Sequence, residues 1–287
     1  MKLSVIIPCY NAADTIGEQL EALAGQQCDT PWEIIVADNG STDGSESLVR
    51  EYQKKIPQLK LIDASGRKGP AHARNTGARA ATGDTLLFCD ADDVVGEGWL
   101  AAMARGLTVH EFVAGRCEGE KLNCPKQLRG RNVSQQSGLP VYNYPEFLPH
   151  AGAGNLGIKR YLHDSINGFN ESMPFLEDTD YCWRAQLAGA TLYFEPDALV
   201  HVRLRPSFWR SLKQARTWGK YNVYIYKKYL AHGMPKLGYR RSIKTWVRLF
   251  KQLPRIRNSA NLARWLWLFS WGLGRIEGSI KFRVWGL

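Results

Sequence analysis

The chain has 287 residues, 44% of them hydrophobic and 23% charged, a composition typical of a globular protein and unlike that of disordered or collagen-like chains. Its formal net charge of +11 is unevenly distributed along the chain. Residues 204–287 contain 19 Lys and Arg and one acid (+18), whereas residues 1–203 contain 19 Lys and Arg and 26 acids (−7). Seven of the ten tryptophans also follow residue 203, so we expect a domain over residues 1–203 and a basic, tryptophan-rich region over residues 204–287.

Short β-branched runs alternate with helical patterns along the first 89 residues. Strands are expected at residues 3–7, 33–37, 59–63 and 85–89, and helices at residues 12–24, 45–55 and 71–81. This alternation is typical of successive β-α units. We therefore predict an α/β fold with a mostly parallel sheet flanked by helices.

The pattern after residue 89 is less regular. A helix is expected at residues 99–107, whereas residues 116–150 are polar and punctuated by Pro, Gly and Asn, which favours a long variable loop. Regular structure is expected again at residues 152–158, then as a helix at residues 177–187 and as short strands at residues 191–195 and 198–201.

Polar clusters follow three of the predicted strands, at residues 8–11, 38–43 and 90–93. In an open α/β sheet, ligands bind beyond the carboxyl ends of the strands, so these clusters should line one crevice. The three aspartates of residues 90–93 repel one another unless a cation lies among them, and oxygen ligands of this kind suit Mg²⁺ or Mn²⁺. An acidic turn that caps the next helix is the alternative.

Six short motifs occur in a fixed order along residues 1–203. They are SVIIPCYN at 4–11, IIVADNGSTD at 34–43, GPAHARNTG at 69–77, DADD at 90–93, GFN at 168–170 and LEDTDYCWR at 176–184. In this order and spacing they resemble the inverting family 2 glycosyltransferases of the GT-A fold. The resemblance implies a Rossmann-like GT-A domain over residues 1–203, followed by the basic helical extension.

The resemblance also implies how a nucleotide-sugar donor is bound. Tyr10 would lie against the base, Asp38 would accept a hydrogen bond from it, and Arg74 would support the nucleotide. The full set of implied donor-binding residues is Pro8, Tyr10, Asn11, Asp38, Asn39, Arg74, Asn75, Asp90, Ala91 and Asp92. Asp90 and Asp92 match the D-x-D pattern of the family and, together with His201, would hold Mn²⁺ or Mg²⁺. For Arg74 and Asn75, helix packing is the alternative role.

By the same resemblance, Asp178 would be the catalytic base and Glu177 its orienting neighbour. Asn155 and Arg184 would lie near the acceptor or the diphosphate. Acids at a helix N-terminus are also favoured by the helix dipole alone, which is the structural alternative for Glu177 and Asp178. The implied reaction is transfer of a hexosyl or N-acetylhexosaminyl group, with UDP-sugars favoured, to a hydroxyl of a glycan or lipid-linked acceptor. A nucleotidyltransferase and a non-catalytic nucleotide-sugar-binding scaffold are the competing functions.

The region from residue 204 onward interleaves Trp, Tyr and Leu with Lys and Arg in several helical patterns. Such helices suit the plane of a membrane interface, so we expect peripheral binding to an anionic membrane surface. A nucleic-acid-binding arm and a solvated helical brace are the alternatives. No stretch reaches the roughly 20 apolar residues of a spanning helix.

The six cysteines form no C-x-x-C pair, and the apolar run at the N-terminus is too short for a signal peptide. We interpret the cysteines as reduced thiols, with a Cys117–Cys124 disulfide or metal pair as the alternative. The expected location is therefore cytoplasmic, at the inner face of a membrane.

Overall fold

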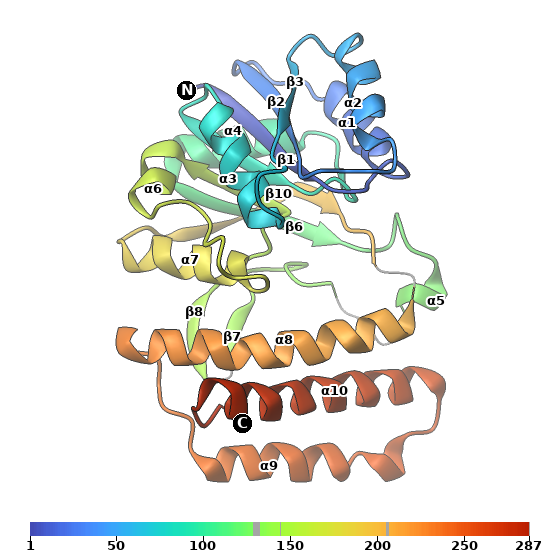
Figure 1. Cartoon of the computed structure of the whole chain (residues 1–287), viewed down its shortest axis with the longest axis vertical. Helices are drawn as coiled ribbons and strands as arrows, with labels where there is room; N and C mark the ends of the chain where they lie inside the picture. The colour runs from blue at the N-terminus through green and yellow to red at the C-terminus, as the bar shows by residue number, and fades with distance from the viewer. Residues whose placement is uncertain (129–132, 144, 205–206, 287) are drawn as a thin grey trace. The chain divides into compact units, whose positions relative to one another are not determined.

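The computed structural model describes residues 1–128, 133–143, 145–204 and 207–286, and the chain divides into two units (Figure 1). Unit 1 comprises residues 1–122, 133–140 and 149–203, and unit 2 comprises residues 123–132, 141–148 and 204–287. Two short segments of the expected loop over residues 116–150 thus belong to the unit that contains the C-terminal region. Residues 129–132 and 144 of that loop lie outside the described residues.

Unit 1 is built on an eight-stranded mixed sheet. In sheet order its strands are β3 (Leu59–Asp63), β2 (Trp32–Asp38), β1 (Leu3–Cys9), β4 (Thr85–Cys89), β9 (Asn155–Lys159), β6 (Phe112–Glu118), β10 (Leu192–His201) and β5 (Val94–Val95). Strands β3, β2, β1 and β4 run parallel, β9 is antiparallel to both of its neighbours, and β10 is parallel to β6. The predicted α/β class is confirmed.

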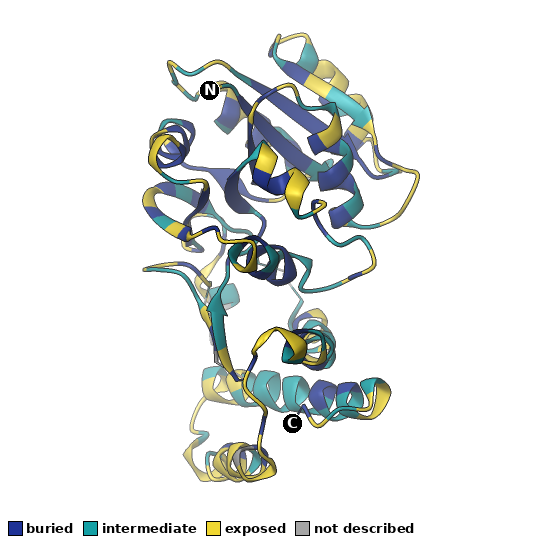
Figure 2. Cartoon of the chain, turned by 90° about the vertical axis from the view of Figure 1, so that its left-hand side faces the viewer, coloured by how far each residue is buried: buried dark blue, intermediate teal, exposed yellow. Residues whose placement is uncertain are grey.

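Helices flank this sheet and bury their apolar faces against it. They are α1 (Ile16–Ala24), α2 (Ser45–Gln53), α3 (Pro70–Ala80), α4 (Trp99–Val109), α6 (Arg160–Ser165) and α7 (Glu177–Leu187). In α1, for example, Ile16, Leu20 and Leu23 recur at the spacing that places them on one side of a helix, and all three are buried. Figure 2 shows the strands as the most buried part of unit 1.

The structure differs from the sequence-based expectation in the second half of unit 1. Strand β6 and helix α6 were not expected, and β9 lies where regular structure of unspecified type was expected over residues 152–158. The two short strands predicted near residues 191–201 form one strand, β10. The pairing of β10 with β6 shifts register between Glu195 and Val200. This irregularity explains why the sequence pattern there suggests two strands.

Glu33 is a buried carboxylate that ties together three strands and a turn. It accepts hydrogen bonds from Ser4 Oγ at 2.8 Å, from the N–H and hydroxyl of Thr82 at 2.6 and 2.7 Å, and from Lys60 Nζ at 2.7 Å. Burial raises the pKa of Glu33, but the hydrogen bonds from Lys60, Thr82 and Ser4 outweigh it, so the pKa falls to about 2. Glu33 is therefore ionised and stabilising at neutral pH.

We expect Glu33→Gln to lower the free energy of unfolding by about 1–3 kcal/mol at pH 7, because buried donors lose a charged acceptor. A carboxyl with a depressed pKa stabilises the fold above its unfolded pKa of about 4.3, and this contribution is lost as the pH falls toward its folded pKa. The difference between wild type and variant should therefore shrink between pH 5 and pH 2. Urea unfolding at several pH values measures it, with the exposed Glu46→Gln as control.

Unit 2 contains three long helices, α8 (Phe208–Tyr229), α9 (Tyr239–Phe250) and α10 (Ser259–Phe282), with α10 between α8 and α9 (Figure 1). The short helix α5 (Pro125–Leu128) and the strands β7 (Val141–Asn143) and β8 (Glu146–Pro149) precede them. Glycines let α8 and α10 approach closely, since a Cβ on Gly274 would lie 1.8 Å from the carbonyl oxygen of Arg216. Among the helices of the described residues, none combines the length and apolar character needed to cross a membrane.

Candidate active site

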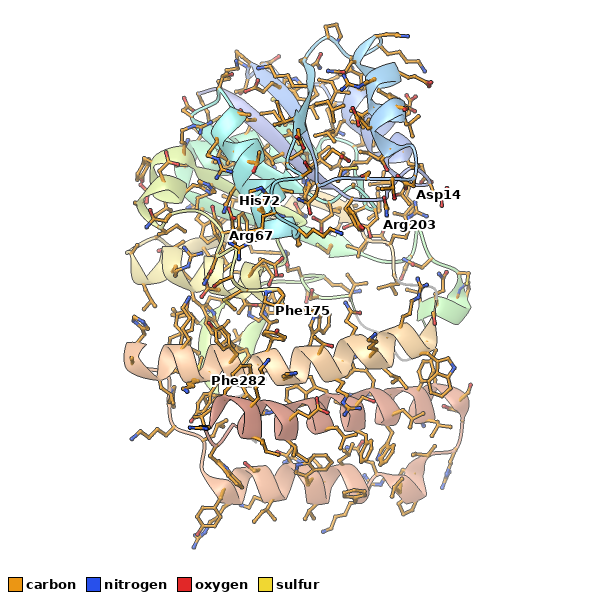
Figure 3. All side chains as sticks on the ribbon, in the orientation of Figure 1. Asp14, Arg67, His72, Phe175, Arg203 and Phe282 are labelled. Atoms are coloured by element: carbon orange, nitrogen blue, oxygen red, sulfur yellow. The ribbon has the colours of Figure 1, made fainter. Side chains whose placement is uncertain are left out.

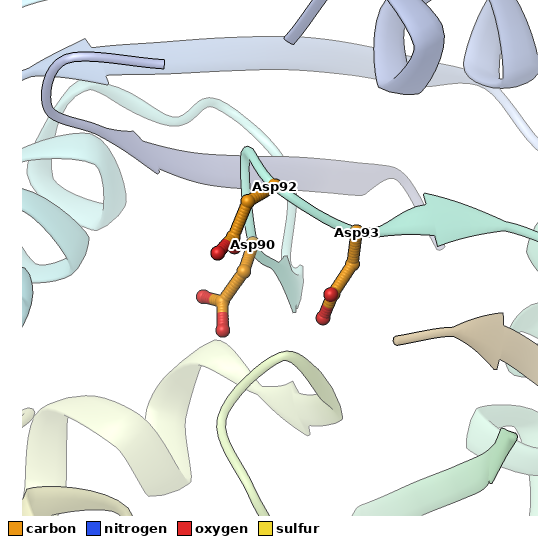
Figure 4. Close-up of side chains that lie close together, drawn as sticks. All are labelled: Asp90, Asp92 and Asp93. Atoms are coloured by element: carbon orange, nitrogen blue, oxygen red, sulfur yellow. The ribbon is translucent and has the colours of Figure 1, made fainter. Parts of the chain in front are cut away.

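Three aspartates converge where β4 ends. The potential ligand oxygens of Asp90, Asp92 and Asp93 lie within 4.8 Å of one another (Figure 4). Asp92 is exposed, Asp90 is partly buried and Asp93 is buried. Burial and then the charges of Asp90 and Asp92 raise the pKa of Asp93 to about 8. Clustered carboxylates that repel one another in this way form a site suited to a divalent cation.

The loop before β9 passes directly over these carboxylates because it contains glycine. A Cβ on Gly154 would lie 2.8 Å from Asp90 Oδ2 and 3.4 Å from Asp93 Oδ2. A Cβ on Gly152, in the same loop, would lie 4.0 Å from Asp178 Oδ2. The loop backbone therefore runs from the aspartate cluster to Asp178, and a side chain at residue 154 would collide with the cluster.

Arg74 connects the aspartate cluster to the acidic start of α7. Gly69 has a φ of 129°, which favours glycine, and Pro70 then begins α3, which carries Arg74. The buried guanidinium donates to Asp90 Oδ1 at 2.7 Å through Nη2 and to Glu177 Oε1 at 3.1 Å through Nη1. Burial opposes its charge, but Asp90 and Glu177 outweigh burial, so the pKa of Arg74 lies above its ordinary value. One buried cation thus holds two parts of the site together.

Glu177 and Asp178 begin α7, after Leu176 in a left-handed conformation with a φ of 60°. Asp178 Oδ1 accepts a hydrogen bond from the N–H of Thr179 at 2.7 Å. Burial raises the pKa of Asp178, and burial together with the charge of Asp178 raises the pKa of Glu177. A carboxylate with a raised pKa is a better proton acceptor. Because Arg74 engages Glu177, Asp178 is the member of the pair that suits this role.

A second group of predicted residues lies at the ends of β1 and β2. Asp38 Oδ2 accepts hydrogen bonds from the N–H groups of Gly40 and Ser41 at 3.1 and 3.0 Å. Its other oxygen, Oδ1, is buried and accepts no hydrogen bond from the described residues. Tyr10 is 52% exposed, and Pro8 is half-buried. A buried acceptor atom beside an exposed aromatic ring is an arrangement that can bind a planar, N–H-bearing group.

Asn11 and Ala91 were also expected at the donor site. Their side chains make contacts within the protein. Asn11 Oδ1 accepts a hydrogen bond from the N–H of Thr42 at 2.8 Å, and the N–H of Asn11 donates to Ser41 Oγ at 2.9 Å. These bonds join the loop after β1 to the loop after β2. The Ala91 methyl group packs in the hydrophobic core, so only its backbone is available for binding.

The amides of Asn39 and Asn75, both expected at the donor site, make hydrogen bonds within the protein. Asn39 donates to the carbonyls of Ala64 and Arg67 at 2.5 and 2.8 Å and accepts from the N–H of Gly69 at 2.8 Å. These bonds join the loop after β2 to the residues that precede α3. Asn75 donates to Phe169 O and Glu171 Oε1 and accepts from the Phe169 N–H.

The loop that Asn75 holds also supports Arg74. The Arg74 guanidinium carbon lies 5.4 Å from the centre of the Phe169 ring. Glu171 Oε2 lies 2.9 Å from His72 Nδ1 and 3.7 Å from Arg67 Nη1, and His72 and Arg67 are both labelled in Figure 3. Residues 169–171 therefore fix the position of α3 and of the arginine that it carries.

Asn155 and Arg184, expected near the acceptor or the diphosphate, also make hydrogen bonds within unit 1. Asn155 is fully buried; it accepts from Trp99 Nε1 and donates to the carbonyls of Arg116 and Ala198, each at 2.9 Å. Arg184 donates to Asp180 Oδ2 at 2.8 Å, to the carbonyl of Gly168 at 2.7 Å and to the carbonyl of Ile166. Both side chains fix local structure, and Gly154, next to Asn155, lies at the carboxylates of the aspartate cluster.

His201 does not belong to the aspartate cluster. Its Nδ1 contacts the carboxylate of Glu118 instead. The sequence interpretation missed Arg203, which is labelled in Figure 3. Its N–H donates to Asp93 Oδ1 at 2.9 Å, and its Nε donates to the carbonyl of Asp92 at 3.1 Å. The sequence signal that could have identified Arg203 was its basic side chain two positions after His201.

The sequence profile described as Glycosyl transferase family 2 matches residues 4–164, more than half of the chain. The chain belongs to glycosyltransferase family 2. The matched span includes the aspartate cluster, Arg74 and the loop over the cluster, and it ends before α7. The predicted family is therefore confirmed.

Curated relatives support the same assignment over different lengths. Glycosyltransferase AglE of Haloferax volcanii is 25% identical over 228 residues, which cover 78% of this chain and 74% of AglE. The pre-mycofactocin glycosyltransferase of Mycobacterium tuberculosis is 30% identical over 212 residues, 69% of this chain and 42% of the relative. The uncharacterized glycosyltransferase YfnE of Bacillus subtilis is 39% identical over 111 residues, 39% of this chain and 27% of YfnE. The chain thus matches less than half the length of the last two proteins.

Solved structures of other glycosyltransferases share the fold. The mannosyltransferase PcManGT of Pyrobaculum calidifontis, in complex with GDP-Man and Mn²⁺, has a TM-score of 0.64 and 21% identity over 96% of this chain and 86% of its own. Residues 1–349 of S. aureus TarS, in complex with UDP-GlcNAc, have a TM-score of 0.56 and 18% identity over 99% of this chain and 93% of that chain. These similarities establish the GT-A fold.

Proposed function

We propose that this glycosyltransferase is inverting and metal-dependent, and that it moves a sugar from a nucleotide-sugar to a hydroxyl of a membrane-associated glycan or lipid-linked acceptor. The observation that carries the proposal is the contact of Arg74 with both Asp90 and Glu177. This contact brings the candidate cation ligands and the candidate base into one constellation. A transferase needs such an arrangement, because the leaving diphosphate and the attacking hydroxyl meet at one carbon.

The donor's nucleoside is proposed to bind between the ends of β1 and β2. The buried Asp38 Oδ1 would accept a hydrogen bond from an N–H of the base, and the exposed Tyr10 ring would stack on the base. UDP-sugars are our favoured donors, and the transferred group would be a hexosyl or an N-acetylhexosaminyl group. PcManGT with GDP-Man and TarS with UDP-GlcNAc show that this fold accommodates donors of both kinds.

Asp90 and Asp92 are proposed to hold Mn²⁺ or Mg²⁺, with Asp93 beside them. Three clustered carboxylates fit an oxygen-ligated cation. Gly154, in the loop above them, adds no side chain that would collide with the cluster. When bound, the cation neutralises charge that develops on the leaving diphosphate. Arg74 would orient Asp90 for this role through its charge-assisted hydrogen bond.

Asp178 is proposed to act as the general base. It takes the proton of the acceptor hydroxyl while the hydroxyl oxygen forms a bond to the anomeric carbon. The bond from that carbon to the nucleoside diphosphate breaks on the opposite face, so the configuration inverts. Glu177, engaged by Arg74, positions the start of α7. A single displacement of this kind requires no enzyme nucleophile.

A donor screen tests the chemistry. We expect one nucleotide-sugar to release its nucleoside diphosphate in the presence of Mn²⁺ or Mg²⁺ and to lose this activity with EDTA. Binding of a donor without release under any condition, acceptors included, would instead indicate a scaffold protein. Release of pyrophosphate from a nucleoside triphosphate and a sugar phosphate would indicate a nucleotidyltransferase.

The membrane part of the proposal rests on the charge of residues 204–287. These residues carry a net charge of +18, and each basic residue near an anionic leaflet adds about 1 kcal/mol of binding. We place the protein at the cytoplasmic face, where its six free cysteines would stay reduced. Full-length protein should sediment with anionic vesicles and be partly released by high salt, since salt screens the charges but not apolar insertion. Binding to DNA but not to vesicles would contradict this location.

A further inference from the structure

Helix α9 has a wider apolar face than its packing requires. Tyr239, Ile243, Val247 and Phe250 follow one another at spacings of three or four residues, so they lie along one side of the helix. Their side chains are 59%, 57%, 46% and 47% exposed. Four consecutive large apolar residues on one helix side are rarely left uncovered without a function. Figure 2 shows how much of this helix is exposed.

The adjoining part of the apolar face is already used. Ser242 and Leu249 are buried, and the ring of Trp246 lies 5.9 Å from that of Phe269 on α10. The carbonyl of Leu249 accepts a hydrogen bond from Trp265 Nε1 at 2.9 Å. Contact with α10 therefore accounts for this part of the face. The Phe250 ring also borders α10, at 6.2 Å from the Trp265 ring and 6.4 Å from the Phe269 ring, although the residue is still 47% exposed. These contacts do not account for Tyr239, Ile243 and Val247 beside it.

Basic residues border the exposed part of the face on its other side. Arg240, Lys244 and Arg248 also recur at spacings of four, and each is exposed. After residue 203 the sequence contains a single acid, Glu277, and its carboxylate contacts Arg216 on α8. The border is thus strongly positive, with no acid in the sequence of α9 to neutralise it.

A shallow apolar groove continues the exposed face. It has a volume of about 660 Å³, and its lining includes Val247, Phe250, Pro254 and Trp285. Lys251 also lines it. An apolar groove with a lysine in its lining can receive hydrocarbon while the ammonium group reaches an anionic headgroup.

An anionic lipid bilayer is the occupant that fits all of these features. A second copy of this chain would bring another strongly basic surface to the same place, and like charges oppose that association. Nucleic acid would satisfy the basic border but not the exposed aliphatic residues. A bilayer presents apolar chains below a layer of negative headgroups, which matches an apolar face edged by Lys and Arg.

We infer that α9 is the membrane-inserting element, with Tyr239, Ile243, Val247 and Phe250 entering the acyl-chain boundary and Arg240, Lys244 and Arg248 contacting anionic headgroups. This inference rests on the membrane part of the proposed function and identifies the surface responsible. Helix α9 would lie in the plane of the interface. Helices α8 and α10, packed closely on each other, would form the support that carries it.

Co-sedimentation with vesicles of phosphatidylcholine and phosphatidylglycerol tests the inference on the full chain. Each fully inserted side chain contributes roughly tenfold to partitioning, so Ile243→Ser with Phe250→Ser should lower it about 100-fold at both low and high salt. Arg240→Gln, Lys244→Gln and Arg248→Gln together should lower it by about 100-fold at low salt only. Val109→Ser, an exposed valine on α4, is the matched control and should change nothing.

A second readout does not depend on the stability of the serine variants. A polarity-sensitive fluorophore on Val247→Cys, in a Cys124→Ser background, should shift to the blue when vesicles are added. Unchanged vesicle binding by the serine double variant, or a fluorophore that stays in water, would overturn the inference. Light scattering could also overturn the inference. It would do so if the protein formed a dimer without vesicles and if these substitutions dissociated that dimer.

Donor binding separates failure of this inference from failure of the proposed transferase chemistry. The α9 variants should bind the nucleotide-sugar found in the donor screen as tightly as wild type. If no donor bound to any variant or to wild type while the vesicle results held, the transferase proposal would fail and the membrane surface would stand.

Discussion

Asp178→Asn should lower turnover by at least ~100-fold, the usual effect of removing a general base. The amide nearly preserves the shape of the side chain but cannot accept the proton of the acceptor hydroxyl. Donor and cation binding should persist, because the aspartate cluster and the contact of Arg74 with Glu177 stay in place. Single-turnover kinetics with acceptor measure the first effect, and calorimetric titration of donor measures the second.

Asp29→Asn is the matched control, since Asp29 is an exposed carboxylate in the loop before β2. Its turnover should equal that of wild type. If Asp178→Asn kept turnover within a few-fold of wild type, the base would be another residue, and Glu177 would be examined next.

The pH profile gives an independent view of the same residue. Burial raises the pKa of Asp178, so its active, deprotonated form is lost at a higher pH than for an exposed aspartate of pKa about 3.9. The acid limb of kcat/KM should therefore lie above that value. The residual activity of Asp178→Asn should lack this limb, because the variant has no proton to gain at residue 178.

The first half of the fold follows from the sequence because each of its elements has a simple local pattern. Strands β1, β2 and β4 are apolar runs that each end in a polar cluster, and the strand pairings place the ends of β1 and β2 side by side. Regular structure was expected over residues 152–158, but its type was not assigned, because Gly157 interrupts the short apolar run of β9. That glycine exists for packing, since a Cβ there would lie 2.6 Å from Leu107 Cδ1. Such a contact, made 50 residues away along the chain, leaves no local signal.

In the site, too, the sequence shows the residue types but not the groups that each side chain contacts. Asp90 and Asp92 could be proposed from the chemistry of clustered carboxylates, whereas Glu177 and Asp178 were proposed from the family resemblance. An asparagine amide can bind a ligand or a backbone group equally well. The sequence therefore could not show which kind of partner Asn75 has. Its partners are backbone and side-chain groups of residues 169–171, nearly 100 residues later.

Asp92→Ala should abolish the metal-dependent part of donor binding. Asp92 is the exposed member of the aspartate cluster, so its removal costs the fold little while it takes an oxygen ligand from the cation. Since even partners of metal ligands usually contribute 10–100-fold to affinity, a loss of at least ~100-fold in Mn²⁺-dependent donor affinity is expected. Without the cation, the charge of the diphosphate faces Asp90 and Asp93 and is repelled by them.

Titration of the nucleotide-sugar with and without Mn²⁺ measures this loss, and Glu97→Ala serves as control because Glu97 is an exposed acid a few residues further along the chain. The control should keep the full effect of Mn²⁺, and the melting temperatures of both variants without metal should match that of wild type. An Asp92→Ala variant that bound donor and Mn²⁺ as tightly as wild type would show that Asp92 is not a ligand. In that case Asp93→Asn would be the next variant to titrate, because its carboxylate is held toward the same point by the N–H of Arg203.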